Sequence, residues 1–143
     1  MQLDRVEVLD FRGIDRLAID LDPLTTIIGE PDGGKSSLLR AIGRVLDAHE
    51  PGKQPRYEVA DFHRPGDDEA SRATSLSVTL GLRADADDPL LPDHERLRDL
   101  VLKGRAGLRI TAHRTTDAEP TTETEWVDHA GEPIKGVDGF NML

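Results

Sequence analysis

The stretch "TIIGEPDGGKSSLLRAI", residues 26–42, decides how the fold of this chain is interpreted. It starts as an apolar run, breaks into a glycine-rich turn and continues with apolar residues at helical spacing. Gly29, Gly34, Lys35 and Ser36 satisfy the pattern G-x-x-x-x-G-K-[ST], with a predicted strand before it and a predicted helix after it. A random chain of this length would match in roughly one case in a hundred or fewer. The stretch therefore predicts a phosphate-binding loop rather than a plain strand-to-helix turn.

The residue types in this loop suit a polyphosphate ligand. Backbone must wrap closely around a polyphosphate so that many N–H groups converge on it, and side chains at the glycine positions would obstruct that approach. The first turn of the following helix adds unpaired N–H groups and the positive end of its dipole, about half an elementary charge. We expect Lys35 to neutralise the β- and γ-phosphates of ATP, Ser36 to ligate Mg²⁺ and Ser37 to donate to the α- or β-phosphate. Lys35 is thus the expected catalytic residue.

The residues between the two defining glycines belong to the same expected ATP site. They are Glu30, Asp32 and Gly33, with Pro31 at the third position of the loop. Proline has no N–H, but this position is not normally a phosphate donor, so Pro31 is tolerated. Asp32 brings a carboxylate close to the phosphates and would weaken binding unless its side chain turns outward.

Composition indicates one globular domain of 143 residues. No apolar run is long enough to span a membrane, and the N-terminus lacks a basic region followed by an apolar one. The absence of cysteine excludes disulfides and thiolate chemistry and fits a cytoplasmic protein. A net charge of −10 repels a phosphate backbone and argues against a dedicated nucleic-acid binder. The best basic set for DNA contact, interpreted here as a solvated face, is Lys103, Arg105, Arg109 and Arg114.

Hydrophobic periodicity predicts a mixed α/β fold in the class of P-loop NTPases, with an antiparallel β subdomain. Alternating apolar residues predict strands at 3–11, 17–21, 76–82, around 108–110 and at 122–127. A nearly continuous apolar run predicts a central buried strand at 24–28. Helical spacing predicts helices from residue 35 to just before 49 and from about 94 to 102, and residues 129–133 read as a turn.

We expect these elements to form the N-terminal part of a P-loop ATPase domain. Residues 1–50 would hold a strand pair, the phosphate loop and the first helix. Residues 51–75 would form an irregular acidic excursion around a short element near 57–62. Residues 76–143 would supply antiparallel strands and a short helix.

The opening of the chain, "LDRVEVLDFRGIDRLAIDLDPLTTIIGEPDGGKSSLLRAIGRVL", resembles ATPases of the OLD (overcoming lysogenization defect) and RecF type, which are ABC-like heads related to SMC proteins. The resemblance rests on the "FRGI" turn at residues 11–14, the strand-loop-strand lead-in and the "GE…GKSSLL" loop. The segments "ADFHRPGDD" and "WVDHAGEPIKGVD" resemble, less specifically, the YbjD-type (DUF2813) subgroup of OLD nucleases.

The resemblance implies a fold, an activity and one more site residue. Arg12 matches the family's arginine near the nucleotide, the alternative being an exposed turn arginine. The family's fold pairs an antiparallel sheet with the sheet that carries the phosphate loop. Its intact members hydrolyse ATP across a head-to-head homodimer and carry a C-terminal Toprim nuclease that cuts DNA with divalent metal. Antiviral defence or DNA repair would be the process served.

The chain departs from the family pattern in what it lacks. We find no apolar run ending in Asp-Glu for a Walker B site, no ABC-type signature loop and no Toprim carboxylate cluster. Asp67, Asp68 and Glu69 are sequential in a loop and are interpreted as solvated. Phosphoryl transfer needs Mg²⁺ held from a second side and a residue that orients water. We therefore expect this chain to bind Mg-ATP but not to hydrolyse it alone, as a segment of a longer ATPase.

Two rival interpretations remain open at this point. "WVDHAG" contains D-x-x-G at residues 128–131, which would suit a small GTPase, but residues 122–125 are polar and no N-K-x-D motif is present. We interpret it as a hairpin turn, with Trp126 packing on a sheet face. The other rival is a stand-alone nucleotide-responsive module that binds a partner protein without catalysis.

Overall fold

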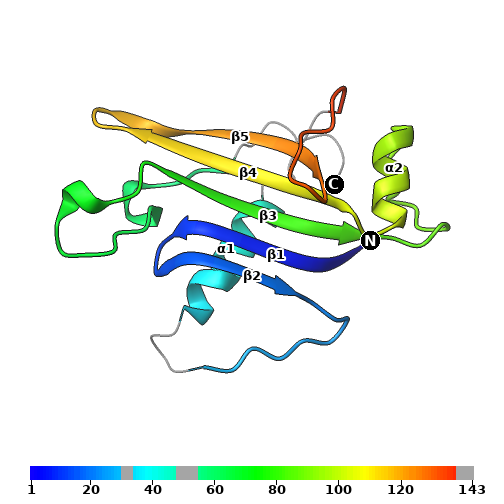
Figure 1. Cartoon of the computed structure of the whole chain (residues 1–143), viewed down its shortest axis with the longest axis horizontal. Helices are drawn as coiled ribbons and strands as arrows, with labels where there is room; N and C mark the ends of the chain where they lie inside the picture. The colour runs from blue at the N-terminus through cyan, green and yellow to red at the C-terminus, as the bar shows by residue number, and fades with distance from the viewer. Residues whose placement is uncertain (30–33, 48–54, 138–143) are drawn as a thin grey trace.

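A computed structural model describes residues 1–29, 34–47 and 55–137, which form one sheet with helices against it (Figure 1). The five strands are antiparallel, in the order β2-β1-β3-β4-β5. The elements along the chain are β1 (Gln2–Phe11), β2 (Ile14–Asp20), α1 (Lys35–Asp47), the 3₁₀ turns η1 (Val59–Asp61) and η2 (Glu69–Ser71), β3 (Ser75–Arg83), α2 (Glu95–Leu102), β4 (Ala106–Thr115) and β5 (Ala118–Asp128). A mixed α/β fold with an antiparallel sheet is therefore confirmed.

Alternation along the strands sends one set of apolar side chains to a single face of the sheet. In β3, Leu76, Val78, Leu80 and Leu82 are all buried, as the sequence pattern predicts. Val78 lies opposite Val8 of β1, so neighbouring strands contribute to the same apolar face. This face is the core of the molecule.

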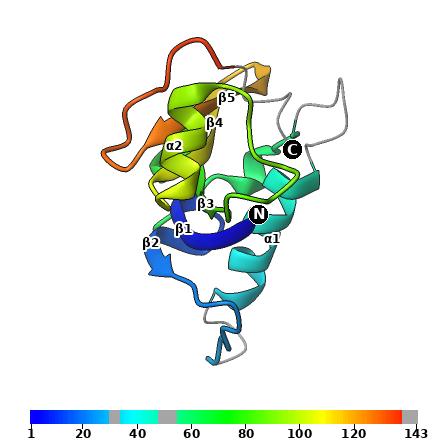
Figure 2. The ribbon, with the colours of Figure 1, turned by 90° about the vertical axis from the view of Figure 1, so that its right-hand side faces the viewer.

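Helix α1 covers that core face, as the view turned by 90° shows (Figure 2). Its buried residues are Leu38, Ala41 and Val45, which recur at the spacing of one helical face. Trp126 of β5 is also fully buried, so its predicted packing on a sheet face is confirmed. The helix that opens at the phosphate loop is thus fixed to the sheet by its inner side.

Residues 24–28 do not form the central buried strand that their apolar run predicts. They have no β-bridge to any described residue, and Leu24 and Ile28 are 88% and 89% exposed. Figure 1 shows this segment passing below β2 on its way to α1. A central strand needs paired neighbours on both sides, and in the described chain the sheet ends at β2. An apolar run alone cannot supply those partners.

The remaining elements agree with the periodicity. Helix α2 and the β4–β5 hairpin occur where predicted, and the chain turns at residues 129–131. Residues 55–74 are mostly irregular and contain η1 and η2. Among the described helices, none has the length and apolar character needed to cross a membrane.

Candidate phosphate-binding site

The described part of the predicted phosphate loop resumes at Gly34, the residue before α1. Gly34 has φ +88°, a left-handed conformation that side chains rarely adopt, so glycine suits this position. Its carbonyl accepts the first helical hydrogen bond, from the N–H of Leu38 at 2.9 Å. Lys35, Ser36 and Ser37 follow in the first turn of the helix. The predicted site residues Glu30, Asp32 and Gly33 lie outside the described residues.

The two ends of the loop are brought together by Lys35. Its ammonium donates a hydrogen bond to the carbonyl oxygen of Gly29. A Cβ on Gly29 would lie 3.7 Å from Cδ of Lys35, so the lysine stem also packs against this glycine. The first turn of α1 holds no acidic residue. Within the first turn itself, no carboxylate opposes the positive end of the helix dipole, which favours an anion at this place.

A cavity of about 600 Å³ lies beside the loop. Lys35, Gly29 and Gly34 line it together with residues 25–28 and residues of β2. The β2 residues are both apolar and charged: Ile14, Leu17 and Ile19, with Asp15, Arg16 and Asp20. This volume is in the range of about 300–1,000 Å³ typical of small-ligand pockets. Arg12 is not among the described residues that line this cavity.

The turn between β1 and β2 lies against the first turn of α1. A Cβ on Gly13 would lie 3.9 Å from Oγ of Ser37, and one on Gly34 would lie 3.7 Å from Cγ1 of Ile14. Arg12, which the family resemblance places near the nucleotide, belongs to this turn. Its guanidinium, however, contacts the carboxylate of Asp61, with Nε and Nη2 at 2.9 and 2.8 Å from Oδ1.

Asp61 is a buried ion-pair partner of Arg12 that the sequence analysis missed. It is fully buried, its Oδ2 lies 3.2 Å from Nη1 of Arg44 on α1, and the same oxygen accepts the N–H of Glu58 at 2.8 Å. The two arginines are 28% and 29% exposed at their side chains, so this ion triad lies at the edge of the core. No local spacing encodes it, because Arg12 and Asp61 are 49 residues apart in the chain. The one available signal was an aspartate enclosed by Ala60 and Phe62.

The β1–β2 turn is held in an unusual backbone conformation. Asp10 and Arg12 have φ +54° and +51°, left-handed values that are uncommon for residues other than glycine. The N–H of His63 donates to the carbonyl of Asp10 at 2.9 Å, and Nδ1 of His63 lies 2.6 Å from the carbonyl oxygen of Arg12. Burial, with the nearby Asp15 carboxylate, raises the pKa of Asp10. Residues 61–63 therefore fasten this turn from outside.

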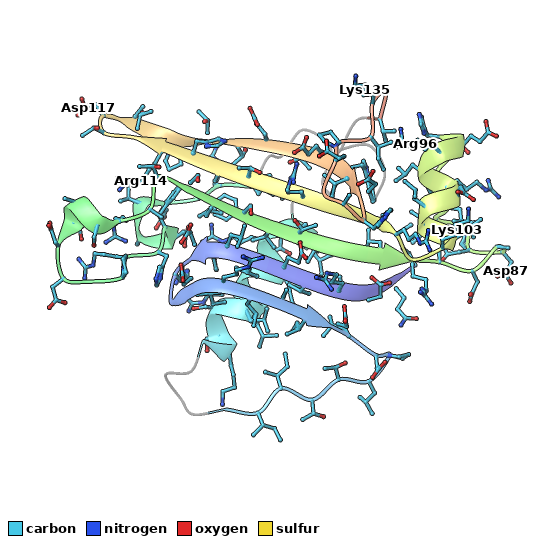
Figure 3. The ribbon with its side chains drawn as sticks, viewed as in Figure 1. Asp87, Arg96, Lys103, Arg114, Asp117 and Lys135 are labelled. Atoms are coloured by element: carbon cyan, nitrogen blue, oxygen red, sulfur yellow. The ribbon has the colours of Figure 1, made fainter. Side chains whose placement is uncertain are left out.

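The predicted basic set does not form one patch. Lys103 and Arg114 lie near opposite ends of the molecule (Figure 3). Lys103 pairs with Asp99 at 2.8 Å, Arg109 pairs with Glu125, and Arg114 donates to the carbonyl of Ala73 at 2.6 Å. Three of the four cations are thus paired within the domain, and Arg105 is exposed.

The acidic residues of the 67–69 run and of the D-x-x-G motif make local contacts within their own loops. In η2, Glu69 is exposed and pairs with Arg64 and Arg72, and these hydrogen bonds, led by that from Arg72, lower the pKa of Glu69 to about 2. Asp128, the first residue of D-x-x-G, accepts the N–H groups of Ala130 and Glu132 at 2.9 and 3.0 Å. Asp128 is the last residue of β5, at the sheet edge opposite β2, and Val127 pairs with Pro133 across the turn, so the motif is a hairpin turn.

Comparison with solved structures shows a likeness of fold to an SMC ATPase. A chain from work on the structural biochemistry of ATP-driven dimerization and DNA-stimulated activation of SMC ATPases matches with a TM-score of 0.59. The match covers 99% of this chain and 76% of that chain at 16% sequence identity, so the likeness is one of fold.

The sequence comparison gives the family. Residues 1–142 match DUF2813, a protein family described as of unknown function, and the chain belongs to it. The uncharacterized protein YbjD of Escherichia coli (strain K12) is 37% identical over 98 residues, which are 68% of this chain. The match spans only 16% of the length of YbjD. The YbjD-type (DUF2813) part of the predicted resemblance is therefore confirmed.

Proposed function

We propose that this chain binds Mg-ATP through residues 29–37 as the N-terminal segment of an OLD/RecF-type ATPase. The carrying observation is the G-x-x-x-x-G-K-S sequence placed at the start of a helix, with Lys35 folded onto Gly29. The fold likeness to an SMC ATPase supports the same class of ligand. Lys35 would contact the β- and γ-phosphates, and Ser36 would be the protein ligand of Mg²⁺.

The backbone of the loop would supply the remaining donors. Ser37 lies in the first helical turn, where its N–H and hydroxyl can reach a phosphate. Arg12 directly precedes Gly13 in the chain, and Gly13 lies against the side chain of Ser37. The family resemblance implies that Arg12 lies near the nucleotide, whereas its guanidinium contacts Asp61 and does not line the cavity beside the loop. Glu30, Asp32 and Gly33 remain predicted members of the loop.

An exposed apolar surface supports the proposal that the segment works within a larger ATPase. Leu24 and Ile28 are exposed before the loop, and Leu39 is exposed on the outer side of α1. A run of this kind is stable as a strand when other strands pair with it and cover it. The intact protein would supply those strands, the catalytic acid and a nuclease, and would act on DNA as a homodimer in the cytoplasm.

The test is calorimetric titration of the chain with Mg-ATP, with phosphate release followed in parallel. We expect saturable binding without turnover. Lys35→Ala should weaken binding by about tenfold or more, because a hydrogen bond to a charged group contributes about 1.5–3 kcal/mol. Lys103→Ala is the matched control, since Lys103 is an exposed lysine paired with Asp99. Equal affinities for the wild type and Lys35→Ala would contradict the proposal.

A further inference from the structure

We propose that His63 is a positioning residue for the candidate phosphate site, because it fixes the β1–β2 turn that forms part of the wall of the cavity beside the loop. The inference rests on the proposed function, since an effect on affinity needs a bound Mg-ATP. It assigns a role to a residue that lies outside the loop, outside the turn and outside the residues that line the cavity. The guanidinium of Arg12 has no part in it, because only the backbone of Arg12 is involved.

His63 holds the turn through two hydrogen bonds. Its N–H donates to the carbonyl of Asp10 at 2.9 Å, and its Nδ1 lies 2.6 Å from the carbonyl oxygen of Arg12. A carbonyl oxygen only accepts, so Nδ1 carries a proton and donates this hydrogen bond. The backbone of His63 is itself fixed, because its carbonyl accepts the N–H of Ala73 at 2.8 Å and the preceding Phe62 is fully buried.

The two carbonyls that His63 holds belong to two residues in strained conformations. Asp10 and Arg12 have φ +54° and +51°, and within the described part of the chain they are the only residues other than glycine with positive φ. Such values persist where the surrounding contacts over-determine them. Asp61 holds the N–H and the side chain of Arg12, whereas His63 holds the carbonyl of each strained residue. Loss of the His63 side chain would therefore release the carbonyl of Arg12 and let the end of the turn relax.

The turn held by His63 leads directly into the candidate site. Gly13 and Ile14 line the cavity of about 600 Å³ to which Lys35 also belongs. A Cβ on Gly34 would lie 3.7 Å from Cγ1 of Ile14. A Cβ on Gly13 would lie 3.9 Å from Oγ of Ser37, so the turn packs against the first turn of α1. When this wall is fixed before binding, less conformational entropy is lost as the ligand binds.

Two amide replacements of His63 separate a positioning role from a merely structural one. Asparagine carries its side-chain N–H close to the place of Nδ1, whereas glutamine carries it close to the place of Nε2. The measured quantity is the affinity for Mg-ATP of the wild type, His63→Asn and His63→Gln, with circular dichroism to confirm that each folds. We expect His63→Asn to bind within about twofold of the wild type, because the donor to the carbonyl of Arg12 is kept, and His63→Gln to bind about fivefold more weakly.

A second readout needs no nucleotide. In the free chain, the amide N–H resonances of Gly34 and Ser37 should shift in His63→Gln and keep their places in His63→Asn, because both residues lie against the turn. His113→Gln is the matched control, since His113 is an exposed histidine of β4, and this variant should match the wild type in both readouts. Should His63→Gln fail to fold, His63→Ala takes its place, because it removes the donor without adding atoms.

The outcomes distinguish this inference from the proposed function. Wild-type binding that is lost in Lys35→Ala but unchanged in His63→Gln would overturn the role of His63 alone. Equal weakening in His63→Asn and His63→Gln would also overturn it, because the hydrogen bond to the carbonyl of Arg12 would then not be the cause. Absence of Mg-ATP binding by the wild-type chain would overturn the proposed function, and the free-chain resonances of Gly34 and Ser37 would then decide whether His63 positions the first turn of α1.

Discussion

The two sides of helix α1 differ in how completely the described chain covers them. On the inner side, Leu38 and Val45 pack against a sheet whose apolar face is buried from β1 to β5. On the other side, Leu39 is exposed, and the apolar residues 24–28 lead into the loop without a strand partner. Burial against the sheet therefore stabilises the inner side of the helix within the described chain. On the loop side, the exposed apolar side chains lack such a covering.

The largest expected effect on stability comes from truncating a buried side chain on the sheet side. Leu80→Ala in β3 removes a side chain that is 1% exposed and should lower the free energy of unfolding by about 2–5 kcal/mol, through lost burial and the cavity left behind. Ile28→Ala on the loop side should change it by less than about 0.5 kcal/mol. Urea denaturation of both variants measures the difference. Equal losses would show that residues 24–28 are packed after all.

The ion triad at the boundary between the two sides should rank next. Asp61→Ala leaves Arg12 and Arg44 without their shared carboxylate. Breaking a fully buried pair costs about 3–5 kcal/mol, and we expect about 2–3 kcal/mol here because both guanidinium groups are partly exposed. Urea denaturation at low and high salt would measure the cost. A loss below about 0.5 kcal/mol would mean that solvent already screens the triad.

Two glycines, Gly34 just before α1 and Gly43 within it, sharpen the comparison between loop and helix. Gly34→Ala forces alanine to φ +88° and should cost about 1–2 kcal/mol. Gly43→Ala, within the helix where an added Cβ meets nothing within 4 Å, should stabilise by about 0.4–1 kcal/mol. Thermal unfolding of the pair should thus give shifts of opposite sign. Shifts of the same sign would contradict the left-handed conformation at Gly34.

The smallest expected effect is one of pH, at Glu69 in the exposed η2 region. Hydrogen bonds from Arg72 and then Arg64 lower the pKa of this carboxyl to about 2, below its ordinary value of 4.5. A depressed folded-state pKa gives stability that is present above the unfolded pKa and is lost as pH falls from about 4.5 towards about 2. Glu69→Gln should remove only that part of the acid dependence. Superimposable pH profiles of the two proteins would show that the pairing adds nothing.

Hydrophobic periodicity in the sequence predicted most of the strands and helix α1, but not the ion pairs of Asp61 with Arg12 and Arg44. The strands over 3–11 and 76–82 and the helix from residue 35 were predictable because alternation and helical spacing are local. The strand at 24–28 was wrong because burial of an apolar run depends on which strands lie beside it. Gly34 was predictable from its motif. Asp61 was not, because its partners are joined to it only by the fold.

The most direct test of the central claim follows the amide N–H resonances of the chain during titration with Mg-ATP. Our account predicts that those of Gly34, Lys35 and Ser36 shift together with a single affinity, while those of the β4–β5 hairpin stay in place. Such a pattern would place the phosphates at the first turn of α1. Shifts that appear in the hairpin while the first turn of α1 stays unchanged would contradict it.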